Sequence, residues 1–515
     1  MTLSELIGAL DAHGLSVTPA GATGPVSSAD PTISAVEYDS RKVVPGAVFV
    51  GLRGANTDGT TFAAQAAAKG AAAIVSDQPA PAGIAAPWVH VRDGRAALAV
   101  LASAFSGYPS RSMLVAGITG TNGKTTTAFL VREIFEAAGL SCGLLGTVQY
   151  RVGAEIRDAA RTTPEATDLQ RMFREMVEAG CRACAVEVSS HALDLRRVDE
   201  TRFAVGVFTN LTRDHLDYHQ DMDRYFAAKR RLFEILPAGA PAVLNADDPR
   251  VASLVGQVPA AITFGIDHDA DVRPVALPVS LMHLAFEATS PAGTIRIESR
   301  LAGRFNIYNL LAAAATGVAV GMPVSAIEGG LAAVTAVPGR LQVVSTPDDE
   351  VVAIVDYAHT DDALKNLLEA VRPLAGARLI TVFGCGGDRD KTKRPLMGAV
   401  AARLSDRVVI TSDNPRSEEP DAIIDDIERG IASASDRAAA RASESAGRGS
   451  PAWTRIVDRR DAIGRAIAEA QPGDVIVIAG KGHEKTQVIR DRELPFDDVA
   501  VAQDALRARR LERAS

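Results

Sequence analysis

The sequence contains few cysteines, few aromatic residues and no excess of basic charge. Four cysteines in 515 residues do not make the disulfide framework of a small secreted domain. Aromatic residues make up 5% of the chain and the formal net charge is -8, so a basic surface for nucleic acid is not expected. The longest apolar run, Leu310 to Val324, is too short and too interrupted to span a bilayer. We therefore expect a globular protein with no membrane or nucleic-acid partner.

The N-terminal segment and one pair of cysteines also bear on the compartment and on the class of protein. The segment Met1 to Leu10 carries Glu5 and no basic residue ahead of its apolar positions, so it is not a signal peptide, and we expect a cytoplasmic protein. Cys181 and Cys184 have the spacing of zinc or redox cysteines. No second pair or neighbouring histidine completes such a site, so buried thiols are the favoured interpretation.

The length exceeds what one hydrophobic core usually supports, so about three domains of roughly 100–200 residues each are expected. Changes of pattern place them at residues 1–110, 111–337 and 338–515. The first reads as a small α/β module, in which Ser40 follows a predicted strand; alone it identifies nothing.

The other two domains alternate strand-like and helix-like segments, which predicts mostly parallel sheets covered by helices. The strand-like runs of the second are Met113–Ala116, Cys142–Val148, Ala183–Val188, Phe203–Phe208 and Ala242–Asn245, with a small antiparallel excursion near 272–300. Those of the third are Val351–Val355, Leu379–Phe383, Arg407–Thr411 and Val475–Ile478. The stretch Ala432–Pro451, rich in Ala, Ser, Arg and Gly, is predicted to be a mobile surface insertion without chemistry.

The most informative segment is the glycine-rich loop Gly117-Ile-Thr-Gly-Thr-Asn-Gly-Lys-Thr-Thr126, which lies between an apolar run and a helix-like run. Glycines let successive backbone N–H groups face an anion, Lys124 can reach phosphate oxygens, and Thr125 can ligate magnesium. The strict pattern GxxxxGK[ST] is missed by one position, because Ile118 stands where its first glycine should be. The order of strand, loop, Lys-Thr and helix nevertheless favours ATP binding over an ordinary turn.

Polar motifs follow the other predicted strands of the central domain, and in parallel sheets such ends bind ligands. Glu187 could hold a divalent cation beside the loop, although a helix-capping carboxylate is the alternative. His215 and His219 have the i, i+4 spacing of zinc ligands, but the glutamate of HExxH is absent, so magnesium is the better account. Helical spacing puts Lys229 on an apolar face, where it could extend along that face to solvent or pair with a carboxylate such as Asp214.

Three charged turns follow strands of the third domain: the glycine-rich turn with Arg389, the segment Asp413-Asn-Pro-Arg416, and Ala479-Gly-Lys-Gly-His-Glu484. Arginines grip carboxylates with two parallel hydrogen bonds, and Asp or Glu can hold an ammonium group. The three turns together predict a pocket for a small zwitterion.

With the loop at 117–126, Glu187-Val-Ser-Ser-His191, the segment 209–219 and Asp413–Arg416, the chain resembles the Mur ligase family over essentially its whole length. The resemblance implies a central P-loop parallel-sheet ATPase domain, a UDP-sugar-binding N-terminal α/β domain and a Rossmann-like C-terminal domain for the amino acid. It implies an ATP-dependent ligase, with Mg²⁺ as cofactor, that joins meso-diaminopimelate to the D-Glu carboxyl of UDP-N-acetylmuramoyl-L-alanyl-D-glutamate in peptidoglycan synthesis. We expect a monomer.

The resemblance also assigns residues to ligands. It implies catalytic roles for Lys124, Glu187, His215 and Lys229. The positions that match nucleotide contacts are Gly120, Thr121, Asn122, Gly123, Lys124, Thr125, Thr126, Asn306, Asn309, Arg340 and His359. Those that match the UDP-muramoyl dipeptide are Ser40, Thr162, Thr163, Ser189 and Arg197. Those that match diaminopimelate are Arg389, Asp413, Asn414, Pro415, Arg416, Gly480 and Glu484, and the metal set is Thr125, Glu187, His215 and Lys229.

Two of these assignments have particular consequences. Lys229 matches a carbamylated lysine of the family, which converts a buried cation into an anion able to hold magnesium. The family pattern has Gln two residues before Arg197, where this chain has Leu195, so one sugar–peptide contact is in doubt.

Three alternatives remain at this stage. The first is a ligase of the same family that adds L-lysine, and the second is a relative of the folylpolyglutamate synthetases. Diaminopimelate carries one carboxylate more than lysine, and Arg416 can pair with it, which argues against the first. The third is an ATP-dependent conformational switch or binding protein, which would not require the charged pocket of the third domain.

Overall fold

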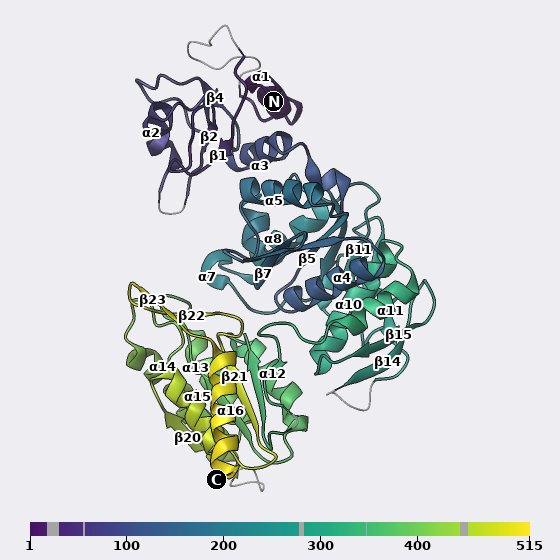
Figure 1. The fold of residues 1–515 in the computed structure, drawn as a ribbon, viewed down its shortest axis with the longest axis vertical. Coiled ribbons are helices and arrows are strands. Elements are labelled where there is room, and N and C mark those ends of the chain that lie inside the picture. The colour runs from purple at the N-terminus through teal and green to yellow at the C-terminus, as the bar shows by residue number, and fades with distance from the viewer. Residues whose placement is uncertain (18–29, 55–56, 278–282, 347, 443–451, 515) are drawn as a thin grey trace.

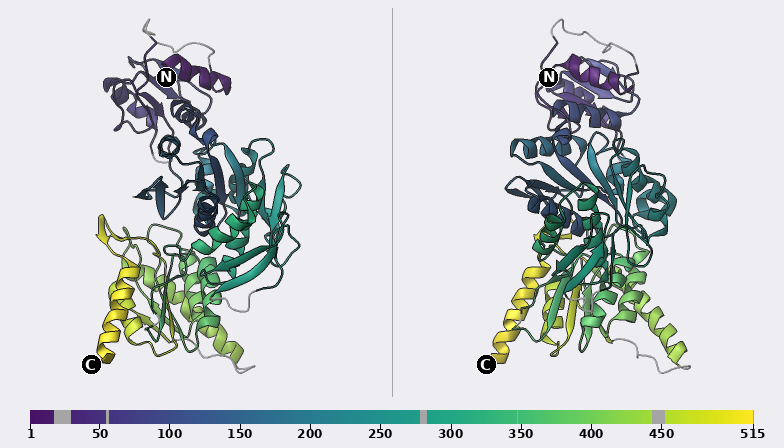
Figure 2. Two further views of the ribbon diagram at one scale, coloured as in Figure 1. Left: turned by 45° about the vertical axis from the view of Figure 1, so that its right-hand side comes forward. Right: turned by 90° about the vertical axis from the view of Figure 1, so that its right-hand side faces the viewer.

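The computed structural model describes residues 1–17, 30–54, 57–277, 283–346, 348–442 and 452–514. They form three α/β parts that follow one another along the long axis, so that the two chain ends lie at opposite ends of the molecule (Figures 1 and 2). No described helix is long and apolar enough to cross a membrane.

The first part is a four-stranded parallel sheet in the order β1-β2-β3-β4. Its strands are β1 (Val36–Glu37), β2 (Val48–Gly51), β3 (Ala73–Ser76) and β4 (Trp88–His90). Its helices are α1 (Leu3–Ala12), α2 (Ala63–Ala68) and α3 (Gly94–Phe105), with 3-10 turns at Gly59–Phe62 and Pro109–Ser112. Apolar side chains of α1 and α3 pack on the buried strands as one core.

The central part is an eight-stranded sheet in the order β12-β11-β10-β5-β9-β6-β7-β8, in which only β7 runs antiparallel to its neighbours. Its strands are β5 (Leu114–Thr119), β6 (Cys142–Leu145), β7 (Gln149–Val152), β8 (Glu155–Asp158), β9 (Ala183–Glu187), β10 (Phe203–Phe208), β11 (Ala242–Asn245) and β12 (Ala261–Phe264). Its helices are α4 (Lys124–Ala137), α5 (Ala166–Glu178), α6 (Ser190–Asp194), α7 (Leu216–His219), α8 (Met222–Glu234), α9 (Pro249–Ala252), α10 (Arg304–Ala319) and α11 (Val324–Ala333).

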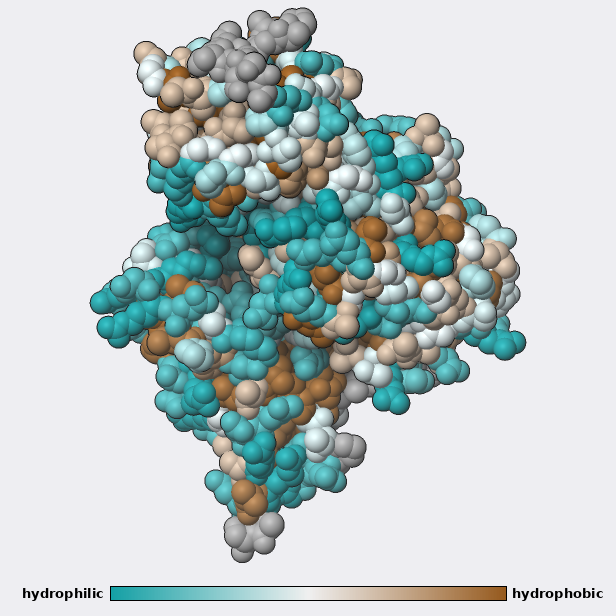
Figure 3. All heavy atoms as spheres, turned by 45° about the horizontal axis from the view of Figure 1, so that its top comes forward, coloured by the Kyte–Doolittle hydropathy of each residue, from teal (hydrophilic) through white to brown (hydrophobic). Residues whose placement is uncertain are grey.

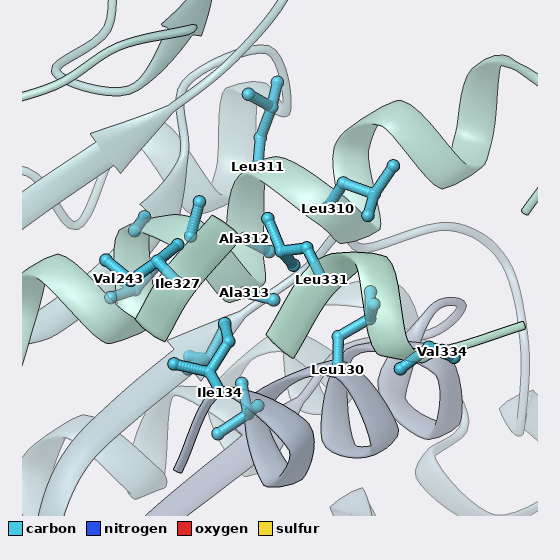
Figure 4. Close-up of a cluster of buried hydrophobic side chains, with 14 of the residues drawn as sticks. Leu130, Ile134, Val243, Leu310, Leu311, Ala312, Ala313, Ile327, Leu331 and Val334 are labelled. Carbon is cyan, nitrogen blue, oxygen red and sulfur yellow. The ribbon is translucent and has the colours of Figure 1, made fainter. Parts of the chain in front are cut away.

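Two cores flank this sheet. One contains side chains of α4, α10 and α11, including Leu130, Ile134, Leu310 and Leu331, which Figure 4 labels within one buried cluster. The other contains side chains of α5 and α8. The apolar run Leu310–Val324 is therefore mostly the buried helix α10. The antiparallel excursion is confirmed as a three-stranded sheet of β13 (Arg273–Pro274), β14 (Leu284–Thr289) and β15 (Ile295–Ser299).

The third part is a six-stranded sheet in the order β16-β17-β21-β18-β19-β20, parallel except for β16. Its strands are β16 (Gln342–Val343), β17 (Val352–Asp356), β18 (Leu379–Phe383), β19 (Arg407–Ile410), β20 (Ala452–Arg455) and β21 (Val475–Ala479). Its helices are α12 (Asp361–Val371), α13 (Lys393–Leu404), α14 (Pro420–Ala442), α15 (Arg459–Ala468) and α16 (Asp498–Ala514), with a 3-10 turn at Arg372–Leu374. A separate hairpin is formed by β22 (Thr486–Ile489) and β23 (Arg492–Pro495).

The first half of the expected surface insertion Ala432–Pro451 is helical, because α14 continues to Ala442. Ala and Arg favour helix, so a run of them extends a helix that has already begun, whatever its surface character. Residues 443–451 of the expected insertion lie outside the described residues.

Candidate functional site

The glycine-rich loop joins β5 to α4, and two of its glycines are required by their surroundings. Gly120 and Gly123 have φ of 144° and 87°. A Cβ at Gly120 would overlap Thr209 Oγ1, and one at Gly123 would overlap Asn309 Oδ1. The loop is thus a backbone surface at the N-terminus of a 14-residue helix, as an anion cradle requires.

Replacing Gly120 by alanine should therefore impair both stability and nucleotide binding. The backbone strain and the overlap together should lower the free energy of unfolding by roughly 2–5 kcal/mol. Thermal unfolding with and without ADP measures both effects.

The matched control is Gly139→Ala. Gly139 also has a positive φ, of 77°, but a Cβ there would meet nothing within 4 Å. It should lose only about 1–2 kcal/mol and keep its response to ADP. Equal behaviour of the two variants would show that the cradle does not depend on the close approach at Gly120.

The loop is held against the segment that follows β10. Thr121 N donates to Asn210 O at 2.9 Å, and Thr209 Oγ1 donates to Asn122 O at 2.6 Å. The side chain of Thr126 is buried in the first turn of α4. These contacts bring two of the predicted strand-end motifs together.

Lys124 and Lys229 share one acceptor. The Nζ atoms of both donate to Gly120 O, at 2.9 Å and 2.8 Å. Burial lowers the pKa of Lys124, and burial together with the charge of Lys124 holds the pKa of Lys229 well below its usual range. Two ammonium groups at one oxygen repel each other, so this arrangement favours a neutral or modified Lys229.

The environment of Lys229 decides between the alternatives raised by the sequence. Its side chain is 1% exposed, so it does not extend to solvent. Its ammonium lies 4.6 Å from the ring centre of Tyr225, and no described carboxylate pairs with it, Asp214 instead lying beside His215. Both ordinary interpretations of Lys229 were therefore wrong.

Glu187, at the end of β9, is a buried carboxylate that accepts hydrogen bonds from neutral groups. Its partners are Thr125 Oγ1 at 3.0 Å, Thr147 Oγ1 at 3.0 Å and Thr147 N at 2.8 Å. No lysine or arginine in the described chain pairs with it. An oxygen-rich, negatively charged position beside the loop fits a hard cation such as Mg²⁺. Lys229 fits that cation only as an anion.

The histidines near the loop do not form a zinc site. His219 Nε2 lies 2.9 Å from Ser190 Oγ, and the rings of His191 and His215 meet edge to face at 5.0 Å. Within the described residues no group of three or more His, Cys, Asp or Glu side chains could hold a metal. Burial lowers the pKa of His215 to about 4, so its imidazole is neutral near pH 7.

Two further groups matched to the nucleotide lie near the loop, one on α10 of the central part and one at the start of the third part. Asn309 faces Gly123 and donates to Asn306 Oδ1 at 2.8 Å. Arg340, at the start of the third part, donates to Thr125 Oγ1 at 3.2 Å. His359 Nδ1 lies 2.9 Å from Tyr357 O and its ring lines the cleft described below.

Four of the five predicted dipeptide residues form one network beside Glu187. Thr163 Oγ1 donates to Glu187 O and accepts from Ser189 N, and Arg197 Nη1 donates to Thr163 O at 3.2 Å. Thr162 Oγ1 donates to Thr147 Oγ1 at 3.1 Å, since the one hydroxyl hydrogen of Thr147 points to Glu187. The fifth, Ser40, lies in the first part of the chain, where its hydroxyl donates to Gln65.

A cleft of about 530 Å³ lies between the central and third parts and is lined by residues of both. From the central part it is lined by His191 and the segment around His215. From the third part it is lined by His359, Arg389, Asp413, Asn414, Arg416, Gly480 and Glu484. In the space-filling view the molecule is hollowed on its left side, and hydrophilic residues surround the hollow (Figure 3).

The three charged turns of the third part meet in this cleft. Asn414 Nδ2 donates to Glu484 Oε2 at 2.7 Å. A Cβ at Gly480 would crowd Asp413 Oδ2, so a glycine lets the turn after β21 approach the turn after β19. Pro415 is buried beside Gly387, and Arg416 Nη1 donates to Gly387 O at 2.7 Å.

The hairpin β22–β23 supports Arg416, a role that the sequence did not suggest. Arg416 N donates to Val488 O at 3.0 Å, and Gln487 Nε2 donates to Asp413 O at 2.7 Å. This pairing holds Arg416 at a φ of 51°, a conformation unusual for a residue with a side chain. Lys481 and Thr147 are two further residues of the site that the sequence analysis did not single out.

Comparisons with known proteins agree with this arrangement. Three family models match: "Mur ligase family, catalytic domain" over residues 32–106, "Mur ligase middle domain" over 118–317, and "Mur ligase, glutamate ligase domain" over 339–482. The chain is 46% identical over 478 residues to UDP-N-acetylmuramoyl-L-alanyl-D-glutamate--2,6-diaminopimelate ligase of Solibacter usitatus, covering 92% of this chain and 94% of that one.

Two further relatives carry the same name. The ligase of Geobacter metallireducens is 46% identical over 473 residues, covering 90% of this chain and 92% of that one. A solved structure of such a ligase superposes with a TM-score of 0.65 at 32% identity and covers 96% of this chain and 100% of that chain.

Proposed function

Because the chain belongs to the Mur ligase family, we propose that it adds meso-diaminopimelate to UDP-N-acetylmuramoyl-L-alanyl-D-glutamate in peptidoglycan synthesis, at the expense of ATP. The observation that carries the proposal is the cleft at which the residues beside the phosphate loop face the turn Asp413–Arg416. A site that activates a carboxyl group and a site that holds an amino acid must face each other for an amide to form.

The first step makes the carboxyl group reactive. A carboxylate oxygen of the dipeptide attacks the γ-phosphorus of ATP, the bond to the β-phosphate oxygen breaks, and an acyl phosphate and ADP result. Lys124 lies in the loop where it can turn from Gly120 O to the transferring phosphoryl group. Bound Mg²⁺ would offset negative charge on the phosphates, held by Thr125 and Glu187.

The second step forms the amide. A neutral amine of diaminopimelate attacks the acyl carbon, phosphate leaves, and the amine loses a proton. His215 and His359 line the cleft, and burial lowers the pKa of both, which keeps their imidazoles neutral and able to accept hydrogen bonds. The third part holds the amine on the side of the cleft opposite to the loop.

We propose that Lys229 acts as a carbamate. A neutral lysine amine attacks CO₂, and the carbamate forms with release of one proton. The depressed pKa of Lys229 supplies the neutral amine, and the carbamate replaces repulsion with attraction toward Lys124 and the metal.

Phosphate release from the purified protein tests the overall reaction. It should require ATP, the UDP-muramoyl dipeptide and meso-diaminopimelate together, and proceed at least about 100-fold more slowly with L-lysine. The control omits the dipeptide, since a nucleotide-dependent switch would still hydrolyse ATP. Comparable rates with the two amino acids would contradict the assignment of the substrate.

A further inference from the structure

Lys481 is a buried charged residue that the proposed mechanism does not use. It follows β21 in the turn Ala479–Glu484, and its side chain is 0% exposed. A buried ammonium is costly unless it is fully hydrogen-bonded, so its partners indicate what it does.

Every polar partner of Lys481 Nζ belongs to the proposed amino-acid pocket. It donates to Asn414 Oδ1 and to Glu484 Oε2, each at 3.0 Å, and lies 3.7 Å from Asp413 Oδ1. Two hydrogen bonds and one longer ion pair thus surround the ammonium group. The polar contacts of Lys481 are therefore part of the pocket, so the residue is more than a buried side chain of the core.

These contacts fix which way Asn414 points. Its Oδ1 accepts from Lys481 and from Val488 N at 2.9 Å, which leaves Nδ2 to donate to Glu484 Oε2 at 2.7 Å. One carboxylate oxygen of Glu484 thereby accepts two hydrogen bonds, and Glu484 also lines the cleft. The arrangement of the pocket depends on the Lys481 ammonium.

The balance of charges in the pocket also depends on Lys481. Asp413 and Glu484 carry two negative charges, and Lys481 cancels one of them. The nearby Arg459 is fully buried but is paired with Asp498 at 2.7 Å, so it does not alter the balance. Among the charges that contact Lys481, one negative charge is left for the one ammonium that the amino acid retains once its attacking amine is neutral. Arg389 and Arg416 line the same cleft and can pair with carboxylates.

We propose that Lys481 is a positioning and specificity residue for the amino acid: it orients Asn414 and Glu484 and sets the charge of the pocket. The inference rests on the proposed function, in which this pocket holds diaminopimelate. Without Lys481 the pocket has one more negative charge. L-Lysine has one carboxylate fewer than diaminopimelate, so its relative reactivity should rise.

The test is Lys481→Met in the full-length enzyme, because methionine keeps the length of the side chain and removes the charge. The KM for diaminopimelate should rise about 10- to 100-fold, whereas the KM values for ATP and the UDP-muramoyl dipeptide stay within about twofold. The ratio of kcat/KM for L-lysine to that for diaminopimelate should increase at least about fivefold.

The matched control is Lys485→Met, which removes a lysine four residues later. Lys485 is exposed and pairs with Asp497 at 2.6 Å, outside the cleft, so this variant should match the wild type in all constants. Lys481→Gln keeps one donor for Asn414 and should show a smaller change in the same direction. If circular dichroism and ADP binding show that Lys481→Met does not fold, the Lys481→Gln variant is used to test the role of Lys481.

Two results would overturn the inference. One is an equal rise of all three KM values with an unchanged lysine ratio, which describes a purely structural role. The other is an unchanged KM for diaminopimelate. Failure of the wild type to use diaminopimelate would instead refute the proposed function, so the two failures are distinguishable.

Discussion

Lys229→Ala should lower kcat/KM by about three orders of magnitude, and short carboxylic acids such as acetate should restore part of the activity. Removal of one group that stabilises a transferring phosphoryl or acyl oxygen typically costs a factor of about 10²–10³. The alanine leaves a space next to Gly120 O and Tyr225, where a small carboxylate can take the place of the carbamate. Phosphate release at increasing acetate concentration measures the rescue.

Lys124→Ala is the control for this experiment. It removes a cation that shares the same carbonyl oxygen, so acetate should not restore its activity. Wild-type protein with ¹³C-bicarbonate should in addition show a carbamate signal that Lys229→Ala lacks. Full activity of Lys229→Ala, or equal rescue of both variants, would contradict the carbamate.

Arg416→Asn should remove most of the preference for diaminopimelate over L-lysine. A site built to pair with a charged group rejects an analogue that lacks it by as much as about 10⁴-fold, because its own charge is then left unpaired. Asparagine tolerates the φ of 51° at this position better than most residues, so the change tests the guanidinium and not the backbone. We expect kcat/KM for diaminopimelate to fall about 10²- to 10³-fold and that for L-lysine to change little. Chromatography of the products from each amino acid measures both.

Arg490→Asn is the matched control for this variant. Arg490 also has a positive φ, of 55°, and lies in the adjacent hairpin, but its side chain is exposed and pairs with Glu419. It should retain wild-type selectivity. If Arg416→Asn keeps the wild-type ratio of the two amino acids, another group must read the additional carboxylate.

The sequence predicted the parts of the molecule that depend on local pattern. Buried strands followed by polar turns identified the edges at which Glu187, Asp413 and Gly480 lie, and the glycine spacing identified the loop. The spacing of apolar residues on α8 placed Lys229 on a buried face. The sequence could not identify Gly120 O as the hydrogen-bond partner of Lys229. The two residues are 109 positions apart, and every residue has a backbone carbonyl, so no residue type indicates which one accepts.

Features that arise from packing between distant segments were not predictable in the same way. The order of strands in the central sheet, the hairpin beneath Arg416 and the contacts of Lys481 depend on such packing. In the stretch after Ala432, the low-complexity composition that suggested a surface insertion gave no sign that the preceding helix continues to Ala442. The assignment of individual residues to substrates stays a prediction until the variants are measured.

The single carbonyl oxygen of Gly120, shared by the ammonium groups of Lys124 and Lys229, couples two binding events thermodynamically. A carbamate on Lys229 would favour the charged form of Lys124, and a nucleotide that needs this charge would in turn favour the carbamate. Linkage requires the two effects to be equal, so CO₂ and nucleotide should each raise the affinity for the other by the same factor. Dissolved CO₂ would then act as a cooperative ligand of the enzyme.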